Sequence, residues 1–287
     1  MRRVVAPLVA LVLVGCAPPR ATTVPVSGTD AASAQVPGLT PDAPFRASPP
    51  PPEPVKPWSI PALQTTALPN GMHLVVVERH ATKLVAATML LRGGTAGAAP
   101  EAASVVAMAV DVAFHGTAKR SERDVYETIN TLFADAGTLA TDDAVVFRLR
   151  ATTASFDAGL ALMRDIFVEP AFEPRVVDFE RQRRVSLLPK DGDDAYRVAV
   201  RMLHVAAYGG AHPYTKGRLS GADALPTVTR DELLRAWKRV VDPSEATLVV
   251  AGDVDPTALA VRVGELFAGW KHDPAHAPPA DVPPATP

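Results

Sequence analysis

Residues 68–72, Leu68-Pro69-Asn70-Gly71-Met72, form the stretch that decides the fold. An Asn-Gly pair between two apolar runs is a strong signal for a β-hairpin, because both residues accept the positive φ of a tight turn. The flanking residues 65–68 and 72–79 predict the two strands of that hairpin. Residues 84–91 predict a third strand, which ends at Arg92-Gly93-Gly94. The folded part of the chain therefore begins with β-structure.

Helical patterns follow these strands. Residues 102–114 are rich in Ala and Val and have little polar face, which predicts a buried helix. Residues 121–134 predict a helix that gathers apolar side chains on one side, namely Val125, Ile129, Leu132 and Phe133. A later stripe of Met and aromatic residues at helical spacing is expected to be core and not a cofactor contact, and consists of Phe156, Leu160, Met163 and Phe167.

The remaining predicted elements give a mixed α and β chain. They are a strand at 145–150, a helix that begins at Pro174, a helix at 194–208, a helix capped by the box Thr229-Arg230-Asp231-Glu232, a strand at 246–251 and a helix that begins at Asp255-Pro256.

The composition excludes some classes of function. The 287 residues carry 29 Lys and Arg against 31 Asp and Glu, so the net charge is near zero and gives no reason to expect nucleic acid as a partner. One cysteine allows no internal disulfide, so stability must come from an ordinary hydrophobic core. A hydrophobic content of 47% is compatible with such a core.

The N-terminus has the pattern of an export signal. An apolar run at 4–14 follows the basic start Met1-Arg2-Arg3, and it is shorter than the ~20 apolar residues that a bilayer span needs. Leu13-Val14-Gly15-Cys16 resembles the lipobox of bacterial lipoproteins, which implies that Cys16 is lipidated and becomes the mature N-terminus. We therefore expect a periplasm-facing protein anchored by lipid in the bacterial cell envelope. The outer membrane is favoured because Ala17 gives no obvious inner-membrane retention signal.

Five local sequences, taken in order, resemble the insulinase/pitrilysin-like metallopeptidases, which include mitochondrial processing peptidase. They are Leu68-Pro69-Asn70-Gly71-Met72, Arg92-Gly93-Gly94-Thr95-Ala96, Phe114-His115-Gly116-Thr117, the run Tyr208-Gly209-Gly210-Ala211-His212-Pro213-Tyr214 and the run Leu248-Val249-Val250-Ala251-Gly252-Asp253-Val254. The resemblance implies an α+β, LuxS/metallohydrolase-like domain of the N-terminal type, in which helices pack on one face of a largely antiparallel sheet. It also implies a partner, either a catalytic chain of the family or a second copy of the domain.

Four segments result from this interpretation. They are a lipoprotein signal peptide at 1–16, a Pro-rich disordered linker at 17–60, an insulinase-like peptidase domain at 61–271 and a Pro-rich tail, or linker to a missing domain, at 272–287.

The zinc motif of the family, His-x-x-Glu-His, is degenerate in this chain. Active relatives hold zinc between the two histidines and a distal glutamate, and the glutamate of the motif accepts a proton from the metal-bound water. The resemblance places this motif at Ala107-Met108-Ala109-Val110-Asp111 and the distal glutamate at Glu180. Ala107 and Val110 carry no donor atom, and the carboxylate of Asp111 alone does not make a zinc site. We therefore expect no catalytic residues and no bound cofactor.

Other assignments remain open. Asp111 and His115 are four residues apart, so one helical face could present both to a metal together with Glu180. Glu180 could instead be a carboxylate on a solvated, charged helix face, since Arg181, Arg183 and Arg184 surround it. His272 and His276 in the tail could bind metal loosely.

The favoured function is that of a non-catalytic homologue, which binds peptide or serves as the partner subunit of a cell-envelope protease. One alternative is an active zinc metalloendopeptidase that uses Asp111, His115 and Glu180 as atypical ligands. Another is a binding or structural module tethered to the envelope, with no connection to proteolysis.

Overall fold

A computed structural model describes residues 48, 59, 61–97, 103–216, 222–279 and 281–284, and for 189–193 and 216 it describes the backbone alone. The chain divides into two units, Met1–Trp58 and Ser59–Pro287, and the elements below all belong to the second. The predicted signal peptide, Cys16 and most of the linker lie outside the described residues. Within the described part, no helix is both long and apolar enough to cross a membrane.

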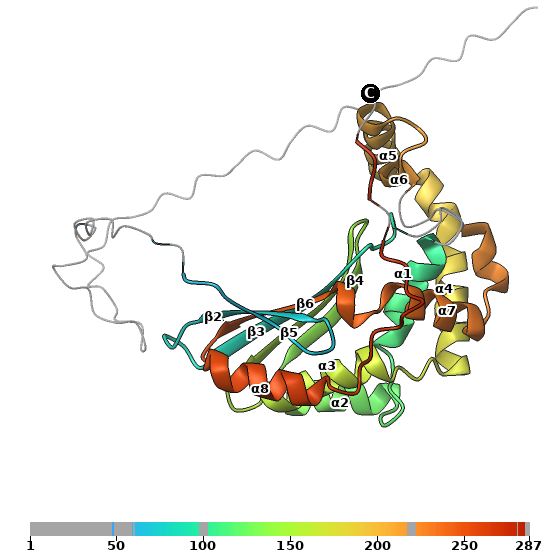
Figure 1. Cartoon of the computed structure of the whole chain (residues 1–287). Coiled ribbons are helices and arrows are strands. Elements are labelled where there is room, and N and C mark those ends of the chain that lie inside the picture. The colour runs from blue at the N-terminus through green and yellow to red at the C-terminus, as the bar shows by residue number, and fades with distance from the viewer. Residues whose placement is uncertain are drawn as a thin grey trace, which may run out of the picture. The chain divides into compact units, whose positions relative to one another are not determined.

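The second unit is built on one six-stranded sheet with the order β1-β2-β6-β3-β5-β4 (Figure 1). Only β2 and β6 run parallel among the described strands, and the other neighbours are antiparallel. The strands are β1 (Gln64–Ala67), β2 (His73–Glu78), β3 (Leu84–Arg92), β4 (Asp135–Ala140), β5 (Ala144–Thr152) and β6 (Ala246–Gly252).

Helices supply the rest of the unit. They are α1 (Ala103–Ala113), α2 (Glu122–Thr131), α3 (Phe156–Val168), α4 (Pro174–Asp193), α5 (Ala195–Tyr208), α6 (Pro213–Lys216), α7 (Arg230–Val240) and α8 (Pro256–Leu266), with the 3-10 turns η3 (Ala222–Thr227) and η4 (Pro243–Glu245).

The predicted hairpin is confirmed, since β1 and β2 pair antiparallel with Ala67 opposite His73. Gly71 has a φ of +93°, which only glycine adopts without strain. The side-chain amide of Asn70 donates to the carbonyls of Phe267 (3.2 Å) and Trp270 (3.3 Å). The turn is therefore fixed to the chain that follows α8, as well as closing the first two strands.

One face of the sheet is covered by helices, as the resemblance implied. In β3 the residues facing the helices are at most 2% exposed, whereas Leu84 and Ala86 on the other face are exposed. Val249 at the middle of β6 is also exposed on that other face. Figure 1 shows α2, α3 and α8 lying on the same side of the strands. One face of the sheet is thus left uncovered by the described residues.

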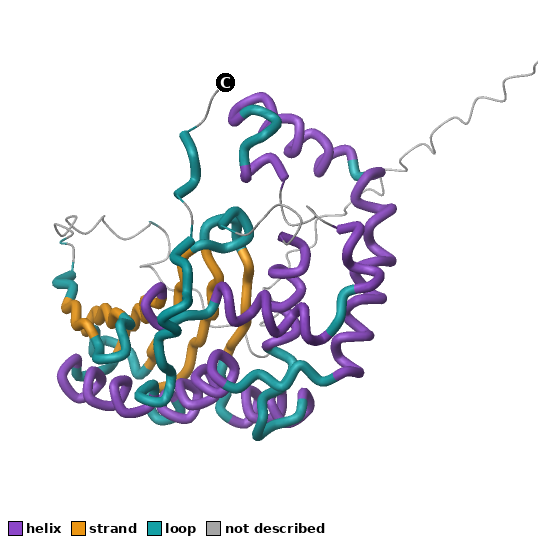
Figure 2. Tube along the Cα trace, turned by 45° about the vertical axis from the view of Figure 1, so that its right-hand side comes forward, coloured by secondary structure: helices purple, strands orange, loops and turns teal. Residues whose placement is uncertain are grey.

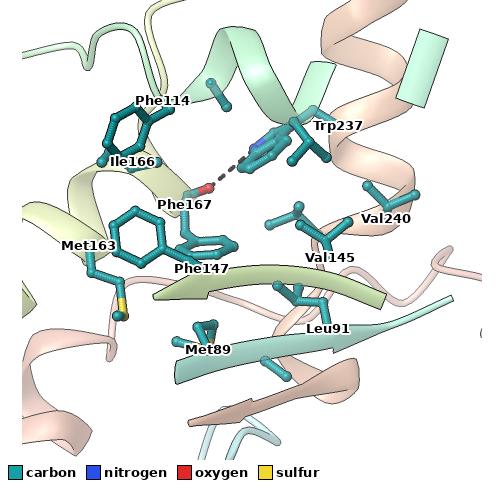
Figure 3. Close-up of a cluster of buried hydrophobic side chains, with 14 of the residues drawn as sticks. Met89, Leu91, Phe114, Val145, Phe147, Met163, Ile166, Phe167, Trp237 and Val240 are labelled. Carbon is teal, nitrogen blue, oxygen red and sulfur yellow. Dashed lines mark hydrogen bonds between the residues drawn. The ribbon is translucent and has the colours of Figure 1, made fainter. Parts of the chain in front are cut away.

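The core lies between the sheet and the helices (Figure 3). The Met and aromatic stripe of α3 is buried there, as predicted, and the ring of Phe167 stacks on that of Trp237 from α7 with centroids 5.8 Å apart. The indole Nε1 of Trp237 donates to the carbonyl of Phe167 (3.2 Å), so the polar atom of this buried ring has a partner.

The prediction for residues 121–134 is only partly right. The helix begins after Ser121 with a capping box to Asp124, but it ends at Thr131. Phe133 adopts a φ of +48° and is 88% exposed, so its predicted packing with Val125 and Ile129 is wrong. Because the chain has already left the helix at this point, helical spacing does not apply to Phe133.

The C-terminal residues lie back along the folded unit (Figure 2). Nδ1 of His272 contacts Oδ1 of Asp242 at 2.8 Å, and Nε2 of His212 lies 2.8 Å from the carbonyl of Pro283. Between these points Pro279 packs against Gly93, close enough that a Cβ on the glycine would lie 2.7 Å from it. The tail thus runs from the end of α7, past the end of β3, to the segment before α6.

Candidate functional site

Two helices position the candidate site. α1 is buried on almost every side between α7, β4 and α4, which explains why its sequence is almost wholly apolar. Asp111 is the one charged residue in this helix. α4 begins with Pro174 at its first turn and packs against α1. We call the residues Ala107, Val110, Asp111, Glu180 and Arg184 the α1–α4 site.

Two residues of the α1–α4 site, Ala107 and Val110, have no side-chain atom that could bind a metal or accept a proton. Ala107 and Val110 are fully buried, and each presents only an aliphatic side chain. The carbonyl oxygen of Val110 accepts a hydrogen bond from Oγ1 of Thr138 (3.4 Å), which joins α1 to the edge strand β4. A methyl and an isopropyl group therefore stand where the resemblance places the first histidine and the general base.

A guanidinium group occupies the space between the two carboxylates of the site. Nη2 of Arg184 donates to Oδ2 of Asp111 and to the carbonyl of Ala107, the latter at 3.1 Å. Nε of the same arginine lies 3.9 Å from Oε2 of Glu180. The side chain of Arg184 is only 12% exposed, so this cation is largely withdrawn from water.

Glu180 is buried, which overturns the alternative of a carboxylate on a solvated, charged helix face. Its residue is 3% exposed, although Phe179 beside it is exposed. Arg183 donates to both carboxylate oxygens of Glu180, with Nη2 at 2.6 Å from Oε2. These hydrogen bonds raise the pKa of Arg183 above its ordinary value, so the arginine stays charged.

His115 does not join the carboxylates of the site. α1 ends at Ala113, and Nδ1 of His115 contacts Oε1 of Glu122 at 2.7 Å. Asp111 is held by Arg184 instead. The structure therefore does not bring Asp111, His115 and Glu180 together as one set of ligands.

The donor set does not fit a zinc ion. Across the described ranges of the chain, no group of three or more His, Cys, Asp or Glu could hold a metal. In the tail, His272 contacts Asp242, and its ring centroid is 6.4 Å from that of His276. Protein zinc sites need three or four nitrogen, sulfur or oxygen ligands about one point, and the α1–α4 site presents two carboxylates with an arginine between them.

β4 forms the edge of the sheet next to the α1–α4 site, and the residue pattern does not indicate it. Asp135-Ala136-Gly137-Thr138 has few of the β-branched and aromatic residues that favour strands. β4 pairs only with β5 among the described strands, and its other edge faces away from the sheet. At the start of β4, a cavity of about 570 Å³ lies on the uncovered face, and Leu84, Ala86 and Phe133 are among its lining residues.

The model for Insulinase (Peptidase family M16) matches residues 74–215, which include every residue of the α1–α4 site. The chain belongs to the insulinase family. A second model of this family, Peptidase M16 inactive domain, matches residues 227–287. That stretch supplies α7, β6 and α8, and β6 pairs with both β2 and β3. Both matched stretches thus contribute to a single sheet.

Known relatives agree with this assignment. A probable mitochondrial-processing peptidase subunit beta of Arabidopsis thaliana is 20% identical over 216 residues, which cover 75% of this chain and 40% of the relative. A protease from Helicobacter pylori has a similar structure, with a TM-score of 0.70, 17% identity, and coverage of 77% of this chain and 53% of that one. The periplasmic protease PqqL of Escherichia coli gives a TM-score of 0.68 and 19% identity over 78% of this chain and 25% of its own.

These similarities show the insulinase-family fold and not the reaction. The chain spans less than two thirds of the length of each of these three relatives. PqqL and the H. pylori protease are therefore larger proteins that contain a unit like this one.

Sequence reasoning missed Arg184 as part of the site. The signal was present in Glu180-Arg181-Gln182-Arg183-Arg184, where positions four apart share a helix face. From its composition, however, this run resembles a solvated patch. Only the packing of α4 on α1 decides which arginine turns inward.

Proposed function

We propose that this insulinase-family chain is a non-catalytic subunit of a cell-envelope protease, which binds peptide beside a partner chain that carries an intact His-x-x-Glu-His motif. The observation that carries the proposal is the composition of the α1–α4 site. Hydrolysis in this family needs a metal to activate water and a base to accept its proton. Ala107 and Val110 supply neither, and Arg184 engages the carboxylate of Asp111.

The sheet offers a means of holding a peptide without cleaving it. An extended peptide can add a strand to an exposed sheet edge, with main-chain hydrogen bonds for affinity and nearby pockets for alternate side chains. β4 provides such an edge, and Thr138 ties it to α1. The cavity at Leu84, Ala86 and Phe133 is suited to an apolar side chain of the peptide. The uncovered face of the sheet is available to a partner domain.

The proposed location rests on the N-terminus and on a relative. Cys16 follows an apolar run in a lipobox-like sequence, which supports anchoring by lipid in the envelope. PqqL, which shares the fold, is a periplasmic protease. A periplasm-facing subunit on the outer membrane is consistent with both.

The first experiment measures metal and hydrolysis on the purified chain without its first 16 residues. We expect less than about one tenth of a zinc ion per chain, and no cleavage of a fluorogenic peptide above the rate without protein. Loss of a general base alone costs about 10²–10⁴-fold in rate, and loss of metal activation adds to that. Near-stoichiometric zinc, together with cleavage that a chelator abolishes, would show that the chain is an active peptidase.

The second experiment tests the binding role. A fluorescent 15-residue peptide with alternating apolar residues is titrated against the chain, and the same peptide N-methylated at every second amide is the control. Strand addition predicts at least a tenfold weaker affinity for the N-methylated peptide, because it cannot complete the ladder of hydrogen bonds. Equal affinities would rule out binding at a sheet edge.

A third measurement concerns the partner. An affinity-tagged chain is recovered from the envelope, and the proposal requires a co-purifying insulinase-family chain with His-x-x-Glu-His whose kcat/KM falls when this chain is removed. Full activity of that chain by itself would contradict a subunit role.

A further inference from the structure

The two carboxylates of the α1–α4 site are largely buried, and arginine side chains of the same chain offset their negative charge. The side chain of Glu180 is 4% exposed and that of Asp111 is 24% exposed. Two carboxylates withdrawn from water on facing helices are costly unless a cation lies between them. Two cations meet this cost. Arg183 donates to both carboxylate oxygens of Glu180, and the guanidinium of Arg184 contacts Asp111 directly while its Nε lies 3.9 Å from Oε2 of Glu180.

We propose that Arg184 is a built-in cation that takes the place of a metal ion: it neutralises Asp111, shares the charge of Glu180 with Arg183, joins α4 to α1, and excludes divalent metals from the α1–α4 site. The geometry supports this role because one nitrogen, Nη2, also reaches the carbonyl of Ala107 on α1 at 3.1 Å. The arginine therefore bonds to both a side chain and the backbone of the facing helix.

Arginine is suited to this task in a way that lysine is not. Its guanidinium stays protonated at any physiological pH, and its planar fork of donors can serve several acceptors at once. A guanidinium also has no open coordination position, so it cannot bind and activate a water molecule as a metal does. Arg183 adds a second positive charge on the other side of Glu180. A divalent ion entering the site would face both charges.

This inference goes beyond the proposed function, because it concerns what holds the site together and not what the chain binds. A chain with no peptide affinity and no partner could still use Arg184 in this way. The readouts below are melting temperature and zinc affinity, so their failure is distinct from failure of the peptide-binding experiments.

The first test compares two arginine substitutions. Arg184→Met keeps much of the side-chain volume and removes the charge, and the matched control is Arg123→Met, whose arginine is 84% exposed in a pair with Glu127. We expect the melting temperature to fall by about 5 °C or more for Arg184→Met and by about 1 °C or less for the control. Adding Asp111→Asn and Glu180→Gln to Arg184→Met should recover at least half of the loss, because neither side chain then carries a charge, and Arg183, whose side chain is 44% exposed, stays hydrated.

That recovery separates a charge role from simple packing. If the neutralised triple variant melts no higher than Arg184→Met, or if Arg184→Met melts like the wild type, the proposal is wrong. If Arg184→Met does not fold while the triple variant does, the same conclusion about charge follows from solubility and circular dichroism.

The second test asks whether Arg184 excludes metal. The motif is restored with Ala107→His, Val110→Glu and Asp111→His, once with Arg184 present and once with Arg184→Met, and zinc affinity is measured by competition with a chromophoric chelator. We expect zinc to bind at least about 100-fold more tightly without the arginine. Equal affinities would overturn the exclusion. If the restored variants do not fold, the comparison of melting temperatures decides the proposal.

Discussion

Asp242 shows at the residue scale how one buried carboxylate can hold several segments. It follows α7, and its side chain accepts hydrogen bonds from the backbone N–H of Ser244 and of Asp273, both at 2.9 Å. Nδ1 of His272 is 2.8 Å from its Oδ1. Burial alone would raise the pKa of Asp242, but the hydrogen bond that Oγ of Ser244 donates (2.6 Å) and the three contacts above outweigh it and lower the pKa to about 2.

The lowered pKa of Asp242 predicts a loss of stability in acid. A carboxyl group whose pKa is lower in the folded state contributes stability above its unfolded pKa near 4, and that contribution disappears as the pH falls from about 4 to about 2. We expect Asp242→Asn to lower the free energy of unfolding by about 2 kcal/mol at pH 7 and by much less near pH 2. Urea titrations at the two pH values measure this, and the exposed Glu127→Gln is the control. A pH-independent difference would contradict the role of the charge.

At the scale of the elements, Gly252 is a position in the sheet where the backbone conformation and the close approach of a neighbouring strand both require glycine. It ends β6 with a φ of +145°, and an added Cβ would lie 2.3 Å from the carbonyl oxygen of Leu84 on β3. The glycine therefore permits the close pairing of two central strands, since it lies opposite Val85.

Gly252→Ala is predicted to be among the most damaging small substitutions in the sheet. Strain at such a φ costs about 1–3 kcal/mol, and the clash with β3 adds to it, so we expect the free energy of unfolding to fall by more than about 2 kcal/mol. Gly137→Ala in β4 is the control, because nothing lies within 4 Å of its Cβ position. Similar unfolding midpoints for the two variants in urea would disprove this account.

The sequence predicts elements well where local pattern and environment agree. The hairpin at 68–72 follows from its turn residues. The buried helix α1 and the stripe of α3 follow from the spacing of their apolar residues, because the residues at that spacing are the ones that pack in the core. The residue pattern does not predict β4, because an edge strand beside a helix tolerates Asp, Gly and Ala. Phe133 does not lie where helical spacing places it, because α2 ends at Thr131 and Phe133 itself has a positive φ.

The same contrast holds for the candidate site. Once the family is known, the sequence alone shows that Ala107 replaces the first histidine of the motif and that Val110 replaces the general base. The inward turn of Glu180 and Arg184 depends on how α4 meets α1, and a helix with so many charges gives no local sign of it. Side-chain direction on a charged helix is decided by tertiary packing and not by composition.

At the scale of the whole molecule, the N-terminus predicts attachment to a membrane. Two or more acyl chains give stable anchoring at about 0.8 kcal/mol for each buried methylene, and the lipobox-like sequence predicts the thiol of Cys16 as the point of attachment. We expect Cys16→Ser, expressed in a bacterial host, to move most of the protein from the membrane fraction to the soluble fraction. Metabolic labelling with a palmitate analogue should mark the wild type alone. Labelling of the variant would show that Cys16 is not the acceptor.

The parallel pairing of β2 with β6 has a consequence for how the protein is made. His73 lies beside Thr247, so the second strand of the sheet meets its neighbour about 170 positions later in the chain. Sheets closed by such distant segments form slowly, since the entropy of a long loop must be overcome first. A nascent chain cannot complete its sheet until Gly252 at the end of β6 has left the ribosome, and until then the apolar strands before it lack their final neighbours. That delay is compatible with the export that the N-terminal sequence predicts.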